Sequence, residues 1–178
     1  MPSDLLLDAC VELNLVASGV ELAELAGTVN ARFVMTSVVA SETPWVNPLD
    51  ASQPRERIDS DGLAARGISF VMLDPDESER FVELARDIED GEAATLAVAV
   101  HRGLRVATDD RKAIRLAASL SPPVKVLRTS DLLKRWAEDP QVDDAPAGLA
   151  VRWTEVRASF VPPSNDPNLE WWNAVIAT

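Results

Sequence analysis

The sequence predicts an α/β fold with a mostly parallel sheet that helices cover on both faces. Short β-branched or Leu-rich runs of strand length recur along the chain, and segments with apolar residues at three- and four-residue spacing separate them. Strands that alternate with helices form right-handed βαβ units, and such units build parallel sheets. The expected strands are Leu5–Leu7, Arg32–Met35, Ile68–Leu73, Leu104–Ala107 and Val124–Leu127.

The helices between these runs are predicted from apolar spacing and from signals at their ends. Asp90 is expected to cap a helix that starts near Gly91, and Gly103 is expected to end it before the fourth strand. Another helix is expected after Ser130. The periodic apolar sets are Val11, Leu15 and Val16; Val38, Val39 and Val46; Phe81, Leu84, Ala85 and Ile88; and Ala94, Leu96, Ala97 and Val100.

A change of composition after Trp136 divides the chain into two parts. Residues 1–137 are expected to form the α/β domain, and residues 138–178 a Pro- and Trp-containing C-terminal extension that packs on the domain or on a partner. Four of the five tryptophans lie from Trp136 onward. The extension is expected to contain a linker at Glu138–Gly148 and helices near Leu149–Ser159 and Asn168–Ala177.

The composition is typical of one soluble domain. The chain has 178 residues, of which 47% are hydrophobic and 26% charged. Its single cysteine, Cys10, excludes an intrachain disulfide and a cysteine-rich zinc site. No window approaches ~20 apolar residues, and the first residues lack the basic region of a signal peptide. A cytoplasmic protein without a membrane segment is therefore expected.

Acidic residues follow two of the expected strands. Asp8 comes directly after Leu5–Leu7, and Asp109 and Asp110 come after Thr108 at the end of the fourth strand. Glu42 is expected one to two turns into the helix after the second strand, and Glu92 in the first turn of the helix that leads to the fourth. Ligands bind outside the carboxyl ends of parallel strands, so these acids are expected to meet in one pocket.

A cluster of carboxylates suits a hard divalent cation. Mg²⁺ and Mn²⁺ prefer oxygen ligands, and a cation relieves the mutual repulsion of the acids. Such a cation activates water and stabilises the charge that builds on a phosphate. The only histidine, His101, has no obvious partner in the sequence, so no Ser-His-Asp or Cys-His arrangement competes.

Each acid also has a purely structural interpretation, which the sequence leaves open. Asp8, Asp109 or Asp110 can cap the helix that follows it. Glu92 can complement the dipole of a helix N-terminus, and Glu42 can be an exposed helix residue. Only their joint placement at strand ends favours a site.

The basic residues are concentrated in one stretch of an otherwise acidic chain. The net charge is −12, yet nine of the 17 Lys and Arg lie within residues 101–135, beside three acidic residues. A solvated pair of helix faces is one interpretation. A basic strip next to an acidic pocket is also what a nuclease presents, which makes Arg111, Lys112 and Arg115 candidate nucleic-acid contacts.

Four segments in order carry these features. They are Leu5 to Cys10 (LLLDAC), Thr36 to Glu42 (TSVVASE), Asp90 to Ala99 (DGEAATLAVA) and Val106 to Ala113 (VATDDRKA). Their order and spacing resemble the motifs of the PIN-domain family. The third and fourth are similar to the Gly-Glu helix and the Thr-Asp-Asp segment of one PIN subgroup.

The resemblance implies a three-layer α/β/α sandwich around a parallel sheet of about five strands. It also implies hydrolysis of phosphodiester bonds, usually of RNA, with Mg²⁺ or Mn²⁺ as cofactor. Carried over by motif, Asp8, Glu42 and Glu92 are metal ligands and Asp110, or else Asp109, is the fourth acid. Thr108 is implied to help order the metal-bound water. Many bacterial members are toxins of type II toxin–antitoxin pairs, so a homodimer and an antitoxin protein are expected partners.

Other functions compete with a metal-dependent ribonuclease. A PIN-like scaffold with vestigial acids, which binds a protein partner, is favoured by the acidic Trp-containing extension and the net charge of −12. A phosphatase with Asp8 as nucleophile is disfavoured, because that chemistry wants a second acid two residues on and Cys10 stands there. No Gly-rich loop follows the first strand, which disfavours a dinucleotide site.

Overall fold

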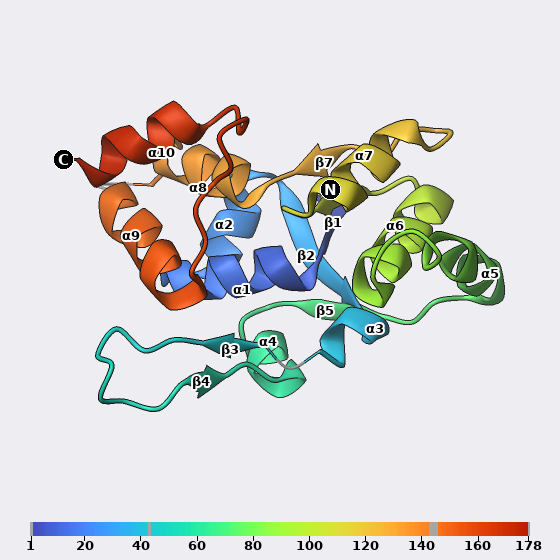
Figure 1. Cartoon of the computed structure of the whole chain (residues 1–178), viewed down its shortest axis with the longest axis horizontal. Helices are drawn as coiled ribbons and strands as arrows, with labels where there is room; N and C mark the ends of the chain where they lie inside the picture. The colour runs from blue at the N-terminus through green and yellow to red at the C-terminus, as the bar shows by residue number, and fades with distance from the viewer. Residues whose placement is uncertain (1, 43, 143–145, 178) are drawn as a thin grey trace.

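The computed structural model describes residues 2–42, 44–142 and 146–177. Its centre is a five-stranded, entirely parallel sheet in the order β5-β2-β1-β6-β7, with helices on both faces (Figure 1). The predicted α/β class is therefore confirmed. The strands are β1 (Ser3–Leu7), β2 (Ala31–Thr36), β5 (Ser69–Val71), β6 (Arg105–Ala107) and β7 (Val126–Leu127), and each overlaps one of the expected runs.

Side chains of the central strands alternate between two separate cores. Leu5 and Leu7 of β1 point to the same core as Phe33 of β2, whereas Leu6 joins Val34 in the other. All three leucines are fully buried. A strand that is covered on both faces has an apolar residue at every position rather than at alternate ones, which is why β1 could be recognised as a run.

Among the described residues, five helices cover the first face of the sheet. The C-terminal extension contributes two of them, and its Trp172 is fully buried in the core that contains Leu5. The indole of Trp172 also donates a hydrogen bond to Glu155 at 2.9 Å. The extension thus packs on its own chain. The helices of this face are α1 (Ala9–Ser18), α2 (Leu22–Thr28), α8 (Thr129–Ala137), α9 (Ala147–Ala158) and α10 (Leu169–Ile176).

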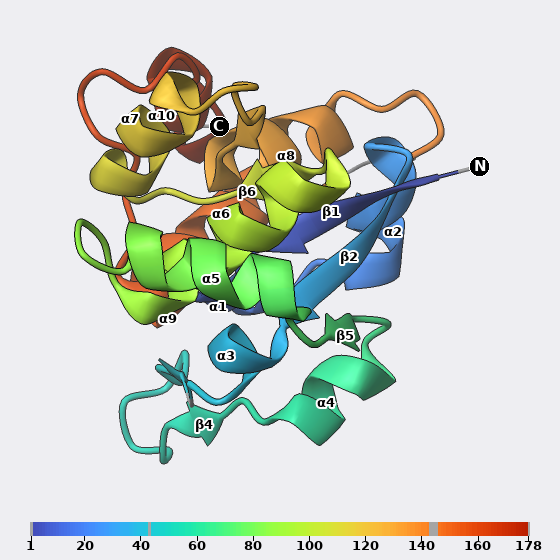
Figure 2. The same cartoon turned by 90° about the vertical axis from the view of Figure 1, so that its right-hand side faces the viewer.

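The second face is covered by α6 (Asp90–Arg102) and α7 (Arg111–Ser119), with α5 (Pro75–Leu84) packed outside α6 (Figure 2). Gly103 ends α6 in the left-handed conformation, as predicted. The expected cap at Asp90 is wrong by one residue, since Glu89 occupies the N-cap position without a side-chain hydrogen bond. Among the described residues, no helix combines the length and apolar composition that a membrane crossing requires.

An insertion between β2 and β5 forms a small unit below the sheet in Figure 1. It contains α3 (Ser37–Ala40), the antiparallel strands β3 (Trp45–Val46) and β4 (Glu56–Arg57), and α4 (Ser60–Ala65). The hairpin was not predicted, and Val46, assigned to a helical set, lies in β3.

Arg157 of α9 links this insertion to the domain by hydrogen bonds. Its guanidinium donates to the carbonyls of Val16 and Ala17 at the end of α1, to the carbonyl of Asn47 and to the carboxylate of Glu56, which is 2.9 Å away. One side chain therefore joins α9, α1 and the hairpin.

Candidate metal centre

The acids that follow β1 and β6 lie at the switch point of the sheet. β1 and β6 are neighbours, with Leu7 paired to Ala107, and the amide of Asp8 donates to the carbonyl of Ala107 at 3.0 Å. From β1 the chain continues to β2 and β5 on one side, whereas β6 leads to β7 on the other. Ligands of open α/β sheets bind at such a point, and Asp8 and Asp110 follow the ends of the two strands there.

Asp8 is buried, with 3% of its surface exposed. Its Oδ1 accepts the amide of Ala9 at 2.9 Å and so caps α1, while Oδ2 accepts the hydroxyl of Thr108 at 2.8 Å and the thiol of Cys10 at 3.3 Å. Burial raises the pKa of Asp8 against the effect of these hydrogen bonds, and the charge of Asp110 raises it further. The capping role foreseen for Asp8 is therefore real, and it uses only one of the two oxygens.

Thr108 links the two strand ends. Its hydroxyl donates to Asp8 and accepts the amide of Asp110 at 3.1 Å, and only 1% of the residue is exposed. Asp110 caps α7, because its Oδ1 accepts the amides of Lys112 and Ala113, both at 2.7 Å. Its Oδ2 remains outside the cap. The hydroxyl of Thr108 thus connects the two acids.

Glu92 lies in the first turn of α6, as predicted. Its Oε2 is buried and has no hydrogen-bond partner among the described residues. Burial, followed by the charges of Asp8, Glu89 and Asp110, raises the pKa of Glu92 to about 7. A cation bound to this carboxylate would stabilise its charged form.

Glu42 does not lie within a helix, contrary to prediction. The helix after β2 is a single turn that ends at Ala40, and Glu42 follows it. The side chain is exposed, but its carboxylate lies against α6: a Cβ on Gly91 would stand 2.5 Å from Oε1 of Glu42. Loss of solvent there, and then the charges of Asp8, Glu89 and Asp90, raise its pKa. The charge of Asp8 therefore acts on both Glu42 and Glu92.

Asp109 faces away from these acids. Its carboxylate accepts the amide of Thr129 at 3.1 Å, the hydroxyl of Thr129 at 2.6 Å and the side-chain amide of Asn14 at 3.0 Å. Burial raises the pKa of Asp109 to about 6, although these hydrogen bonds oppose the rise, and the charge of Asp166 adds to it. The structure thus separates the Asp pair, with Asp110 beside Asp8 and Asp109 bonded to α8 and α1.

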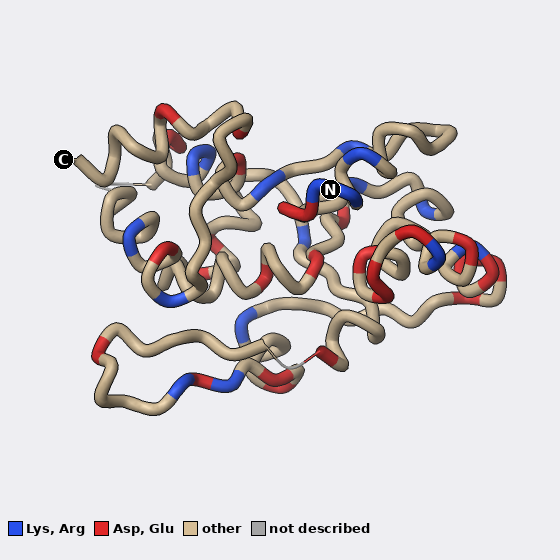
Figure 3. The backbone as a smooth tube through the Cα atoms, in the orientation of Figure 1, with Lys and Arg blue, Asp and Glu red and all other residues tan. Residues whose placement is uncertain are grey.

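A cleft of about 310 Å³ opens beside Glu92 and Asp110. Lys112 lines it, whereas Arg111 and Arg115 are exposed on the same helix outside its lining. Figure 3 shows Lys and Arg on α7 and a concentration of Asp and Glu around α5. No pattern in the sequence pointed to Arg86 as a second cation of the cleft. The lining residues are Arg86, Asp87, Ile88, Glu89, Glu92, Asp110 and Lys112.

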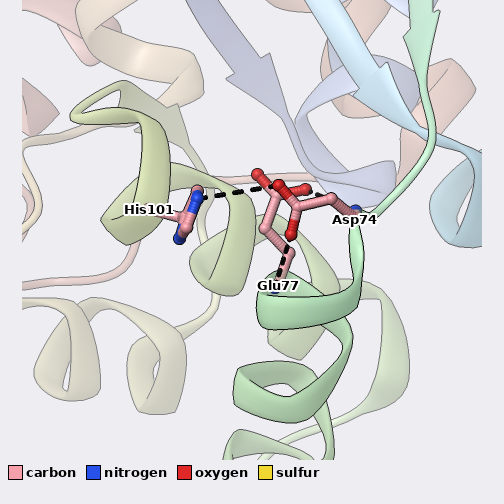
Figure 4. A group of neighbouring side chains, drawn as sticks. All are labelled: Asp74, Glu77 and His101. Carbon is pink, nitrogen blue, oxygen red and sulfur yellow. Dashed lines mark hydrogen bonds and ion pairs between the residues drawn. The ribbon is translucent and has the colours of Figure 1, made fainter.

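Another acidic group, Asp74, Glu77 and His101, lies on α5 and α6 (Figure 4). Each of the three offers a ligand atom within 4.8 Å of the others. Arg102, however, donates to both oxygens of Glu77 at 2.6 and 2.8 Å and lowers its pKa. Asp74 and Glu77 also cap α5 reciprocally. The packing of α5 on α6 accounts for this group without a metal.

The donor set of Asp8, Glu42, Glu92 and Asp110 fits Mg²⁺ or Mn²⁺. All are hard oxygen donors, several raise one another's pKa, and one buried oxygen lacks a partner. Among the described residues only the Asp74 group brings three potential ligand atoms within 4.8 Å of one another, so no three of these four acids lie that close together. Ligands of one octahedral Mg²⁺ stand at most about 4.2 Å apart, so a cation here would contact at most two of the acids directly and reach the others through its waters.

Comparisons of the chain with protein-family models, with curated proteins and with solved structures gave no match. The functional conclusion therefore depends on the chemistry of these side chains.

Proposed function

We propose that this protein is a Mg²⁺- or Mn²⁺-dependent nuclease of the PIN-domain type that hydrolyses phosphodiester bonds in RNA. The observation that carries the proposal is the placement of Glu92. Its buried Oε2 lacks a hydrogen-bond partner among the described residues, at a point where the charges of Asp8 and Asp110 also act. Burial of a carboxylate oxygen without a partner costs stability, and the charges of the neighbouring carboxylates raise that cost by repulsion. A bound cation would offset this cost, because its charge attracts the carboxylates.

Asp8, Glu42, Glu92 and Asp110 would hold the cation. When bound, the cation supplies Lewis-acid activation of water and of the phosphate. Thr108 fixes the carboxylate of Asp8 and the backbone of Asp110, so two of the four donors are oriented before anything binds. Oriented donors lose little freedom on binding, which favours affinity.

The cations around the cleft support a polyanionic substrate. Lys112 and Arg86 line the cleft beside Glu92, and no ion pair of 4.0 Å or less involves either of them among the described residues. They are placed to attract phosphates on either side of the bond to be cut. Arg111 and Arg115 extend the same basic surface along α7.

The test is thermal melting in EDTA, Mg²⁺ and Mn²⁺, with variants that separate the two acidic groups. Asp8→Asn keeps one acceptor oxygen, which suffices for the amide of Ala9, and removes the charge; its NH₂ group takes the place of the oxygen that accepts from Thr108. His101→Ala alters only the other group. A cation at 100 times its dissociation constant stabilises by about 2.7 kcal/mol, which corresponds to a rise of roughly 5–10 °C in a protein of this size. We expect this rise in the parent and in His101→Ala, but not in Asp8→Asn.

Cleavage of a single-stranded RNA should follow the same order across the three proteins. A melting shift that survives in Asp8→Asn and disappears in His101→Ala would place the metal in the other group and contradict the proposal. Absence of a shift in every protein would instead favour a scaffold that binds a protein partner.

A further inference from the structure

The first turn of α8 is held from two sides. On one side Thr129 donates two hydrogen bonds to Asp109, from its amide at 3.1 Å and from its hydroxyl at 2.6 Å. On the other side Ser130 donates its hydroxyl to Asp166 at 2.9 Å. Thr129 and Ser130 are both fully buried. Two neighbouring residues therefore connect the end of β6 with the C-terminal extension.

Asp166 is the centre of the contact from the extension. Its side chain is fully buried, and Oδ2 accepts the guanidinium of Arg128 at 3.1 Å. Oδ1 accepts the hydroxyl of Ser130 and the amide of Asn168, the latter at 2.8 Å. Asn168 donates its side-chain amide to Asp131 at 2.7 Å and to Ser130 at 3.3 Å. A buried carboxylate with donors on both oxygens is held in one place, because any movement leaves a buried charge unpaired.

Asp109 connects this network to the candidate metal centre. It lies between Thr108, which donates to Asp8, and Asp110, whose amide returns to the hydroxyl of Thr108. Its carboxylate is fixed by Thr129. The backbone on both sides of Asp109 therefore has little freedom, and Asp110 leaves β6 in a set direction.

We propose that Asp166 is a positioning residue for the candidate metal centre. Through Ser130 and Thr129 it fixes Asp109, and with it the direction in which Asp110 faces the cleft. The relevance of this role to catalysis rests on the proposed function. The proposal also gives the C-terminal extension a role within its own chain. A residue that only stabilises the fold would loosen the whole protein, whereas Asp166 acts selectively on residues 105–113.

The test compares Asp166→Ala with Val151→Ala at 20 °C, after circular dichroism has checked that each is folded. Val151 is fully buried on α9 and takes no part in the polar network, so its truncation is a control for lost stability. Two quantities are measured: hydrogen exchange of residues 105–113 without metal, and the dissociation constant of Mn²⁺ by titration calorimetry. We expect Asp166→Ala to speed exchange in this segment and to weaken Mn²⁺ binding by up to about 10-fold, the lower end of the loss caused by removing a direct partner of a metal ligand. Val151→Ala should change both by less than about twofold.

Equal effects of the two substitutions on exchange at residues 105–113, or no effect of Asp166→Ala there, would overturn the positioning role. If Asp166→Ala does not fold, Asn168→Ala takes its place, because it removes only the donors to Ser130 and Asp131. A parent protein that binds no Mn²⁺ would defeat the proposed function, while the exchange comparison would still decide the role of Asp166.

Discussion

Replacing Glu12 by glutamine should stabilise the protein, and increasingly so as the pH rises from 4.5 to 8. Glu12 lies in α1 with none of its surface exposed, and neither carboxylate oxygen has a hydrogen-bond partner among the described residues. Burial raises the pKa of Glu12 to about 8, and the charge of Arg66 acts in the opposite direction. The folded protein therefore keeps this carboxyl protonated at pH values where the unfolded chain has ionised it.

The sign and size of the effect follow from this difference. An acid whose folded pKa lies above its ordinary value near 4.5 makes folding take up a proton between the two values, so stability falls as the pH rises through that window. Each pH unit within the window lowers the free energy of unfolding by about 1.4 kcal/mol. The loss is therefore about 3 kcal/mol at pH 6.5 and reaches a ceiling of ~5 kcal/mol above pH 8. Glutamine has the same shape and does not titrate, so Glu12→Gln escapes the cost.

Urea unfolding of the parent and of Glu12→Gln at pH 4.5, 6.5 and 8 measures the effect. The two free energies of unfolding should nearly coincide at pH 4.5 and then separate in favour of the variant. The same substitution at exposed Glu21 controls for the change of net charge. A difference that stays constant from pH 4.5 to 8 would mean that Glu12 is ionised in the fold, and the reasoning from its burial would fail.

Three further substitutions test other contacts. Gly91→Ala places a methyl group against Glu42 and should weaken Mn²⁺ binding about 10-fold in calorimetry. The melting temperature should stay level or rise, because alanine favours a helix over glycine by up to about 1 kcal/mol. An unchanged Mn²⁺ affinity would show that Glu42 is no ligand. Arg102→Met removes the guanidinium from both oxygens of Glu77 and leaves the amide of Asp74 as a partner of that buried carboxylate. It should cost about 3 kcal/mol in urea unfolding, the lower end for a broken buried pair, because Arg102 is itself partly exposed. A loss below about 1 kcal/mol would contradict the structural role given to that pair. Lys112→Ala should reduce RNA binding about 10-fold at low salt in a fluorescence titration and leave Mn²⁺ affinity unchanged; a change in both would place Lys112 in the metal centre.

The sheet could be predicted from the sequence because its strands are buried on both faces. Leu5, Leu6 and Leu7 belong to two different cores, so the strand appears as an unbroken apolar run. The hairpin of β3 and β4 gave no such signal, since each strand has two residues and Glu56 and Arg57 are exposed. A strand this short has no periodicity to detect. Its position is set by tertiary contacts instead.

The candidate site was predictable in position and not in detail. Parallel strands share one carboxyl edge, so Asp8 and the Asp pair after β6 had to lie close together. Thr129, 20 positions further along the chain, donates two hydrogen bonds to Asp109. These bonds determine that Asp110, and not Asp109, faces Asp8. The distance of Glu42 from the helix start also escaped prediction, because α3 is a single turn that spacing cannot delimit.

The long-range contacts of Arg157 have a consequence for the order of folding. This side chain lies 141 residues from Val16, 110 from Asn47 and 101 from Glu56, and it joins all three. Contacts between such distant residues form late, because closing long loops costs entropy before any contact is made. The bonds of Arg157 to Asn47 and Glu56 therefore form only once α9 is in place. We expect the hairpin and α9 to acquire protection from hydrogen exchange together, late in folding.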